Sequence, residues 1–283
     1  MRKYFSLVKF SHTVFALPFA LIGYFLGTRQ PGATFTWREF LLVLVCMVFA
    51  RSAAMGFNRL VDRDIDKQNA RTKGREIPAG KVSKRNALIF VLVNCAGFII
   101  AAGALNNLCL ALSPVALLVI LGYSYTKRFT WLCHFILGIG LSLAPIGAYI
   151  AVTESFHTLP LIFSGVVFTW VSGFDIIYAL QDEEFDRSHH LYSLPAFLGT
   201  KNALLVSILV HITTAVLVYV AGYFALFGII YWLGAGIFTG MLIYQHLIVK
   251  PNDLSRVNMA FATTNGIASV VFGIFVLADL FIM

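Results

Sequence analysis

The stretch that decides the fold is an apolar run ending in regularly spaced polar side chains: REFLLVLVCMVFARSAAMGFNRLVDRDID, residues 38–66. Residues 38–57 are predominantly apolar and have the length of about 20 residues that crosses a bilayer as a helix. Asn58, Asp62 and Asp66 follow at intervals of four residues, so a continued helix projects all three from one face. The stretch therefore predicts a membrane-spanning helix with an amide and two carboxylates at one end.

This row of acidic side chains needs a counter-charge. Like charges four residues apart repel each other on a helix, and ionisable groups at membrane depth are costly. A hard divalent cation offsets both effects, since Mg²⁺ takes oxygen ligands from one or two carboxylates and completes its shell with water and phosphate oxygens. The alternative is a solvated helix end, in which the aspartates pair with Arg59, Arg63 or Lys67.

The same spacing recurs at the end of a second apolar segment, residues 158–180. Tyr178, Asp182 and Asp186 again stand four residues apart. One such pattern arises easily by chance, but two at the same membrane level indicate facing metal sites in the core of a helix bundle. We therefore predict that Asp182 and Asp186 are metal ligands and catalytic residues.

Two charged residues lie deeper in these same segments. Asp175 precedes Tyr178 by three residues, and Arg51 precedes Asn58 by seven, so each shares a helix face with its motif. The two either form a structural salt bridge, because an unpaired charge at that depth is costly, or face a substrate. In the second case, Asp175 orients the substrate or removes a proton from it.

The composition excludes a soluble globular domain. Of the 283 residues, 59% are hydrophobic and 12% are charged, against about 25% charged in soluble domains, and the mean hydropathy is +0.83. The net charge is +8, but the basic residues stand between apolar runs, so membrane lipid and an anionic substrate explain them better than nucleic acid. The four cysteines lie within apolar runs, which argues against a disulfide framework or a metal site.

The whole chain, residues 1–283, reads as one all-α polytopic membrane domain. Nine transmembrane helices are predicted at 10–27, 38–57, 86–104, 108–125, 131–152, 158–180, 201–220, 224–247 and 257–281. If the N-terminus is cytoplasmic, all Lys and Arg residues except Arg29 and Arg38 fall on the inner side, as the positive-inside rule requires. We therefore expect a multi-pass protein of the inner (plasma) membrane with its N-terminus and active-site loops in the cytoplasm.

Basic side chains gather beside the carboxylate motifs. The stretch 67–81 is too polar to span a membrane and carries several cations, among them Arg71, while Lys127 and Arg128 end the fourth predicted span. Cations in these places suit a polyanion such as a diphosphate. The alternative is that they only anchor the topology of the chain.

These residues together resemble the UbiA superfamily of membrane prenyltransferases over nearly the whole chain. The resemblance is carried by Asn58-x3-Asp62-x3-Asp66, Arg71-Thr72, Arg75, Pro78-x-Gly80, Tyr123-x3-Lys127-Arg128 and Asp175-x6-Asp182-x3-Asp186. Within the superfamily the likeness is greatest to 4-hydroxybenzoate polyprenyltransferases. The blocks 9–18 and 174–178 also resemble members placed in menaquinone synthesis by the futalosine route, so the quinone pathway stays open.

The resemblance implies a helix bundle around a central cavity, in which a polyprenyl group passes from polyprenyl diphosphate to an aromatic acid with the help of two Mg²⁺ ions. The expected metal ligands are Asn58, Asp62, Asp66, Asp182 and Asp186. The expected diphosphate-binding residues are Arg63, Arg71 and Lys127. The expected acceptor-binding residues are Arg51, Arg128 and Tyr178, with Asp175 as a further catalytic residue.

Two other classes of membrane protein also place aspartates in the membrane. A CDP-alcohol phosphotransferase needs Asp-Gly-x2-Ala-Arg before Gly-x3-Asp-x3-Asp, whereas here Asn58 replaces the glycine and no such block precedes it. A transporter more often has its carboxylates at the membrane midplane, between repeats, whereas these lie at helix ends. Substrate-dependent release of pyrophosphate separates the enzyme from the transporter.

Overall fold

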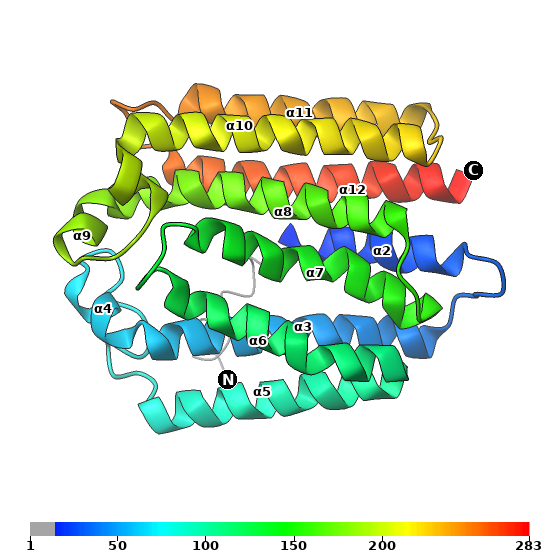
Figure 1. Cartoon of the computed structure of the whole chain (residues 1–283), viewed down its shortest axis with the longest axis horizontal. Coiled ribbons are helices and arrows are strands. Elements are labelled where there is room, and N and C mark those ends of the chain that lie inside the picture. The colour runs from blue at the N-terminus through cyan, green and yellow to red at the C-terminus, as the bar shows by residue number, and fades with distance from the viewer. Residues whose placement is uncertain (1–14, 283) are drawn as a thin grey trace. The chain divides into compact units, whose positions relative to one another are not determined.

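A computed structural model of the chain describes residues 15–282, which form helices joined by turns, with one isolated bridge between Lys250 and Asp253 (Figure 1). Contacts divide the described residues into two compact units. The first comprises residues 36–125, and the second comprises residues 15–35 together with 126–282. The predicted cytoplasmic start, residues 1–9, and the beginning of the predicted span 10–27 lie outside the described residues.

The first unit contains α3 (Trp37–Val61), α4 (Arg63–Gln68), α5 (Lys84–Leu105) and α6 (Asn107–Thr126). Thr36 and Ser83 begin α3 and α5, because each side chain accepts a hydrogen bond from the backbone N–H three residues ahead at 3.2 Å. Gly97 allows α5 to approach α3, since a Cβ at this position would lie 2.7 Å from the ring of Phe49. This close packing supports α3, the helix that leads into the first aspartate motif.

The second unit contains α2 (Leu17–Thr28), α7 (Cys133–Thr153), α8 (Thr158–Ala179), η2 (Leu180–Asp182), α9 (Glu183–Ser188), α10 (Leu194–Phe224), α11 (Ile229–Ile248), the π-helix η3 (Met259–Thr264) and α12 (Asn265–Ile282). Its core is aromatic. Phe19, Trp170, Phe238 and Phe272 are fully buried, with ring centroids between 4.9 and 6.5 Å apart. These rings pack α2, α8, α11 and α12 together, since buried aromatic side chains contribute large apolar areas.

A buried polar network holds the π-helix η3 in place. The Asn265 amide donates to the backbone carbonyl of Phe261 at 3.1 Å, and its oxygen accepts hydrogen bonds from Trp170 Nε1 at 2.9 Å and Gln245 Nε2 at 3.1 Å. The ring of Phe261 then lies 4.1 Å from that of Tyr178, between centroids. The π-helix therefore positions an aromatic ring against the second aspartate motif.

Seven of the described helical segments are long and apolar enough to cross a membrane. The described helix α2 has 12 residues and is shorter, and α11 has 20 residues but is not among the seven. Each predicted span overlaps a helix within the described residues, which confirms the all-α membrane fold class. The number of nine spans stays a prediction.

The predicted boundaries differ most from the structure before the seventh span. We predicted an inner loop at 181–201, but α9 and about the first two turns of α10 lie in it, because α10 begins at Leu194. Gly199 bends α10 near its start with a φ of 76°, a conformation that favours glycine. The bend explains why the apolar pattern alone places the start of the helix too late.

Large apolar side chains cover the outside of the long helices. Ile100, Leu118 and Tyr223 are 71%, 73% and 79% exposed, and many others are similarly open. Soluble monomers rarely expose contiguous apolar surfaces of this kind, so these faces suit contact with lipid.

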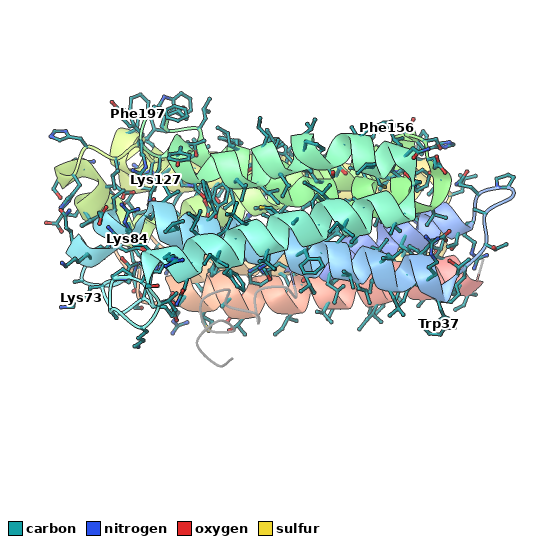
Figure 2. The ribbon with its side chains drawn as sticks, turned by 90° about the horizontal axis from the view of Figure 1, so that it is seen from below. Trp37, Lys73, Lys84, Lys127, Phe156 and Phe197 are labelled. Atoms are coloured by element: carbon teal, nitrogen blue, oxygen red, sulfur yellow. The ribbon has the colours of Figure 1, made fainter. Side chains whose placement is uncertain are left out.

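The labelled lysines of each unit lie toward one end (Figure 2). In the first unit, Lys73 and Lys84 lie toward one end and Trp37 toward the other; in the second, Lys127 and Phe156 lie at opposite ends. Aromatic residues favour the membrane interface. The first aspartate motif follows α3 and precedes the loop that carries Lys73, and Asp186 of the second motif interacts electrostatically with Lys127, so each motif stands at the basic end of its unit.

Candidate functional site

The first aspartate motif lies at an interruption between two helices. α3 ends at Val61, and Asp62 has φ −85° and ψ 2° before the six-residue helix α4 begins. The backbone N–H of Asp62 still bonds to the carbonyl of Asn58 at 2.9 Å, and that of Asp66 bonds to the carbonyl of Asp62 at 2.7 Å. The prediction of one continuous helix is therefore wrong, although the spacing of four residues survives across the break.

The two aspartates of this motif are buried, with Asp62 2% and Asp66 3% exposed. Asn58 Nδ2 donates to Asp62 Oδ2 at 3.1 Å, and Arg75 Nη1 donates to Asp66 Oδ1 at 2.6 Å. The second oxygen of Asp66, Oδ2, is buried and has no hydrogen-bond partner among the described residues. This burial contradicts the alternative of a solvated helix end.

The partners of the basic residues differ in part from those we considered, since Arg59 does interact electrostatically with Asp66. Arg63 pairs with Asp64 at 3.1 Å and donates to the carbonyl of Leu60 at 2.9 Å, while Asp66 pairs with Arg75. Sequence reasoning placed Arg75 among the resembling residues but gave it no role. Arg71 is exposed, so its side chain is open to solvent at the basic end of the first unit.

Two arginines of α3 lie inside the first unit. The Nε atom of Arg51 is buried without a hydrogen-bond partner among the described residues, and so is the Nε atom of Arg59, whose side chain is only 4% exposed. Arg59 interacts electrostatically with Asp66 and Glu76, but a buried donor without a hydrogen-bond partner is costly, so an anionic ligand would stabilise this region. We had considered Arg59 only as an ion-pair partner of the aspartates at a solvated helix end. Its position directly after Asn58, inside the first aspartate motif, was the available signal for a place in the site.

The second aspartate motif repeats the interruption of the first. α8 ends at Ala179, the short η2 follows, and Asp182 has φ −110° and ψ 5° before the six-residue helix α9. These dihedrals resemble those of Asp62 and lie in the sparsely allowed bridge region, where many active-site residues are found. Tyr178 precedes the break and packs against Phe261.

The loop before α10 connects this motif to Lys127. The backbone N–H of Tyr192 bonds to the carbonyl of Lys127 at 2.7 Å, and that of Leu191 bonds to the carbonyl of Asp186 at 2.8 Å. The Asp186 carboxylate interacts electrostatically with Asp182 and with Lys127. The second unit thus brings two predicted metal ligands and one predicted diphosphate-binding residue together, whereas the neighbouring Arg128 is exposed.

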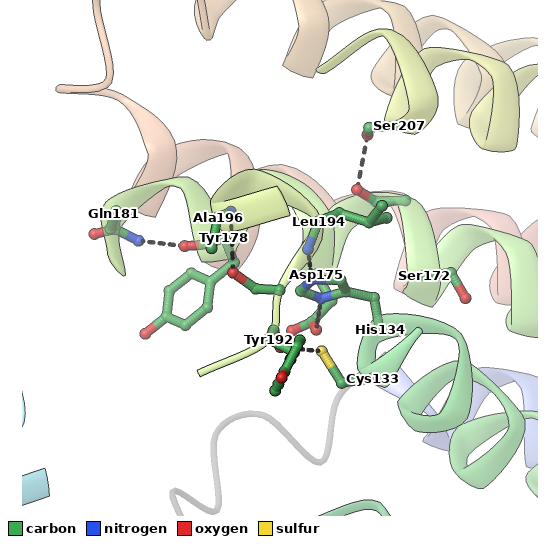
Figure 3. A network of polar contacts seen from close by, with 12 residues as sticks. Cys133, His134, Ser172, Asp175, Tyr178, Gln181, Tyr192, Leu194, Ala196 and Ser207 are labelled. Carbon is green, nitrogen blue, oxygen red and sulfur yellow. Dashed lines mark hydrogen bonds and ion pairs between the residues drawn. The ribbon is translucent and has the colours of Figure 1, made fainter. Parts of the chain in front are cut away.

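Asp175 has a partner that sequence reasoning missed. Its Oδ2 lies 2.7 Å from Nδ1 of His134, and Nε2 of His134 lies 3.2 Å from the backbone nitrogen of Leu194 (Figure 3). We had considered Arg51 as the structural partner of Asp175 and had not considered His134. The available signal was a histidine inside the apolar segment predicted at 131–152, where a buried polar group needs a partner.

Both motifs fit a hard divalent cation, but neither forms a complete cage. Among the described residues, no three His, Cys, Asp or Glu side chains are grouped closely enough to hold a metal ion. Mg²⁺ commonly uses one or two carboxylates and takes its other ligands from water and phosphate oxygens. The unpartnered Oδ2 of Asp66 and the neighbouring carboxylates of Asp182 and Asp186 are suitable oxygen donors.

Membrane-length helices that end in interrupted aspartate motifs, one buried and one half-buried, define a polytopic membrane protein with carboxylates at its helix ends. The match to the UbiA prenyltransferase family extends over residues 16–272. The chain therefore belongs to this family of membrane prenyltransferases, as the sequence motifs predict, and it is a multi-pass membrane protein.

Individual relatives agree with this assignment. The chain is 28% identical over 238 residues to the 4-hydroxybenzoate octaprenyltransferase of Aliivibrio fischeri (strain MJ11), covering 83% of this chain and 82% of the relative. It matches a structure of a UbiA homolog from Aeropyrum pernix K1 with a TM-score of 0.86 and 33% identity, over 95% of this chain and 98% of that one. A UbiA homolog from Archaeoglobus fulgidus, bound to DMAPP and Mg²⁺, shares the fold with a TM-score of 0.78 and 20% identity, over 99% and 100% of the two chains.

Proposed function

We propose that this enzyme transfers a polyprenyl group from polyprenyl diphosphate to an aromatic acid of the 4-hydroxybenzoate type, in the synthesis of a respiratory quinone. The observation that carries the proposal is the buried pair Asp62 and Asp66, because buried carboxylates need a compensating charge and Asp66 Oδ2 has no partner among the described residues. Relatives named 4-hydroxybenzoate octaprenyltransferase support the choice of acceptor.

The reaction needs charge stabilisation at the leaving group. The carbon–oxygen bond of the prenyl diphosphate breaks and its electron pair leaves with pyrophosphate, a ring carbon of the acceptor bonds to the allylic carbon, and the ring proton is lost. Mg²⁺ ions held at the aspartate motifs would supply the positive charge that neutralises the diphosphate as it leaves. We propose that Asn58, Asp62, Asp66, Asp182 and Asp186 hold the metal ions. We propose that Arg63, Arg71 and Lys127 contact the diphosphate.

The acceptor needs a cation for its carboxylate and an acceptor atom for its hydroxyl group. We propose Arg51 and Arg128 for the carboxylate, because Arg51 has an unsatisfied donor and Arg128 is exposed. Tyr178 and the hydroxyl-binding Asp175 complete the set. A hydrogen bond from the hydroxyl to Asp175 would increase electron density on the ring and so favour attack on the allylic cation.

We propose that the chain lies in the inner (plasma) membrane, with its N-terminus and its active-site loops on the cytoplasmic side. The distribution of lysine and arginine along the chain supports this orientation. A hydrocarbon tail can then stay in the bilayer while the polar diphosphate meets the aspartate motifs, and a dry site protects the allylic cation from water.

The decisive experiment uses purified protein in lipid with Mg²⁺, labelled geranyl diphosphate and a panel of aromatic acids, with products identified by mass spectrometry. We expect a prenylated product of 4-hydroxybenzoate and an equal amount of pyrophosphate, both abolished by EDTA. Asp62→Asn should be inactive, whereas Glu184→Gln, at an exposed carboxylate in the second unit, should be active. Binding of the substrates without release of pyrophosphate would favour a transporter. If a prenylated product formed only with a menaquinone-type acceptor, 4-hydroxybenzoate would not be the substrate.

A further inference from the structure

Asp175 sits in α8 with a side chain that is 22% exposed, and one of its two oxygens is already engaged. Oδ2 lies 2.7 Å from Nδ1 of His134, near the start of α7 (Figure 3). Oδ1 has no hydrogen bond within the described part of the chain, and it is not among the buried unsatisfied atoms. The carboxylate therefore has one oxygen held by the protein and one available to a ligand.

The hydrogen bonds of His134 determine which ring nitrogen carries the proton. The backbone N–H of Leu194 lies 3.2 Å from Nε2 and can only donate, so Nε2 must be the unprotonated acceptor. A neutral imidazole then has its hydrogen on Nδ1, where it donates to Asp175 Oδ2. This tautomer makes His134 a donor to the carboxylate and leaves it with no lone pair to take up a proton.

The position of His134 connects three helices of the second unit. Its side chain is 4% exposed, so water does not replace either contact. Leu194 is the first residue of α10, whose N–H has no partner within its own helix, and His134 satisfies it. The contact with Leu194 of α10 thus holds the His134 side chain of α7 in place, and His134 in turn holds Asp175 of α8.

We propose that His134 is a positioning residue for Asp175, which it keeps ionised and turned so that Oδ1 accepts a hydrogen bond from the hydroxyl group of the aromatic acceptor. This inference rests on the proposed function. His134 itself does not touch the acceptor and does not receive its proton. The competing role is purely structural: His134 would only cap the start of α10.

Two substitutions separate these roles, since each keeps one of the two contacts. In His134→Asn the amide nitrogen occupies roughly the position of Nδ1 and still donates to Asp175, but the contact with Leu194 is lost. In His134→Gln the amide reaches roughly the position of Nε2 and still accepts from Leu194, but the donor at the Nδ1 position is lost. The kinetics of both variants are measured with 4-hydroxybenzoate and geranyl diphosphate. A positioning role predicts that His134→Gln is the more impaired variant, and a purely structural role predicts that His134→Asn is.

For a positioning role, His134→Gln should lower kcat/KM for 4-hydroxybenzoate by about tenfold to a hundredfold, the size of a lost hydrogen bond to a charged group, and leave the KM for geranyl diphosphate unchanged. His134→Asn should stay within roughly threefold of wild type. The reverse order, with a normal His134→Gln and an impaired, less stable His134→Asn, would overturn the inference and leave only the structural cap.

A thermal double-mutant cycle adds a measurement that does not depend on activity. If His134 and Asp175 interact as described, the melting temperatures of His134→Gln, Asp175→Asn and the double variant should not be additive. Additive effects would overturn the inference. A wild type that prenylates no aromatic acid overturns the proposed function, and this inference with it, even where the cycle shows coupling; an active wild type with normal His134→Gln kinetics overturns this inference alone.

Discussion

Replacing Asp66 by asparagine removes a charge from the first motif and keeps the shape of the side chain. In the folded chain Asp66 Oδ1 accepts a hydrogen bond from Arg75, and Oδ2 is buried without a partner among the described residues. Asparagine can keep the contact with Arg75 through its carbonyl oxygen, but it presents an amide nitrogen where we propose a Mg²⁺ ligand. Asp66→Ala would separate these effects less well, because it leaves the Arg75 guanidinium unpaired.

The two consequences of Asp66→Asn differ in size. Hydrogen bonds to charged groups contribute about 1.5–3 kcal/mol and neutral ones about 1 kcal/mol, so the free energy of unfolding without metal should fall by about 1 kcal/mol. Loss of one charge-stabilising ligand should lower kcat by about a hundredfold, which is about 2.7 kcal/mol of transition-state stabilisation. Activity should therefore be lost while the fold is retained.

Thermal unfolding in detergent, with and without Mg²⁺, measures the ligand role directly. A ligand that binds only the folded state and is present at 100 times its Kd stabilises that state by about 2.7 kcal/mol. Wild type and Glu184→Gln should show the increase in Tm with Mg²⁺, and Asp66→Asn should lose most of it. An Asp66→Asn protein with the full Mg²⁺-dependent increase and normal turnover would refute the assignment of Asp66 as a ligand.

The remaining predictions concern other parts of the chain. Asp182→Asn and Asp186→Asn should each lower kcat by about a hundredfold at an unchanged Tm, and near-normal turnover of both at saturating Mg²⁺ would reject the second metal motif. Arg51→Ala should raise the KM for 4-hydroxybenzoate and not that for geranyl diphosphate; equal increases would argue against an acceptor-binding role. A cysteine-free protein carrying Ala70→Cys should resist an impermeant thiol reagent in intact cells, because we expect this loop in the cytoplasm. Labelling from outside would show that the loop is extracytoplasmic. Gly23→Val should lower the Tm, because a Cβ there would lie 2.0 Å from a backbone oxygen of α7, and an unchanged Tm would contradict that packing.

The periodic features of this fold could be predicted from the sequence. Long apolar runs identify membrane-length helices because a helix satisfies its backbone hydrogen bonds within one continuous segment in lipid. The spacing of Asn58, Asp62 and Asp66 likewise indicates a shared role. The break at Asp62 could not be predicted in this way, since the interval of four residues is the same in a continuous helix and in one that changes direction at a single residue.

Contacts between segments that are distant in the sequence could not be predicted. The bond from Arg75 to Asp66 crosses a loop, and His134 reaches Asp175 over 41 positions. Both pairs depend on how helices and loops pack, and a single sequence carries no direct record of that packing. The charge of Asp175 within an apolar segment did predict that some partner exists, but the identification of His134 in place of Arg51 required the folded chain.

The short helices α4 and α9, which carry Asp66 and Asp186, have six residues each. Helices of this length are unstable alone, because the free-energy cost of nucleation exceeds the free energy gained from the hydrogen bonds of one or two turns. α4 depends on the contact between Arg75 and Asp66, and α9 depends on the hydrogen bonds that the Glu183 carboxylate accepts from Thr200 and Arg187. Local opening of these segments therefore requires far less free energy than unfolding a span, so their amide hydrogens should exchange with solvent first. A polar headgroup can enter through such openings while the surrounding spans stay folded, and bound diphosphate should slow the exchange at 63–68 and 183–188.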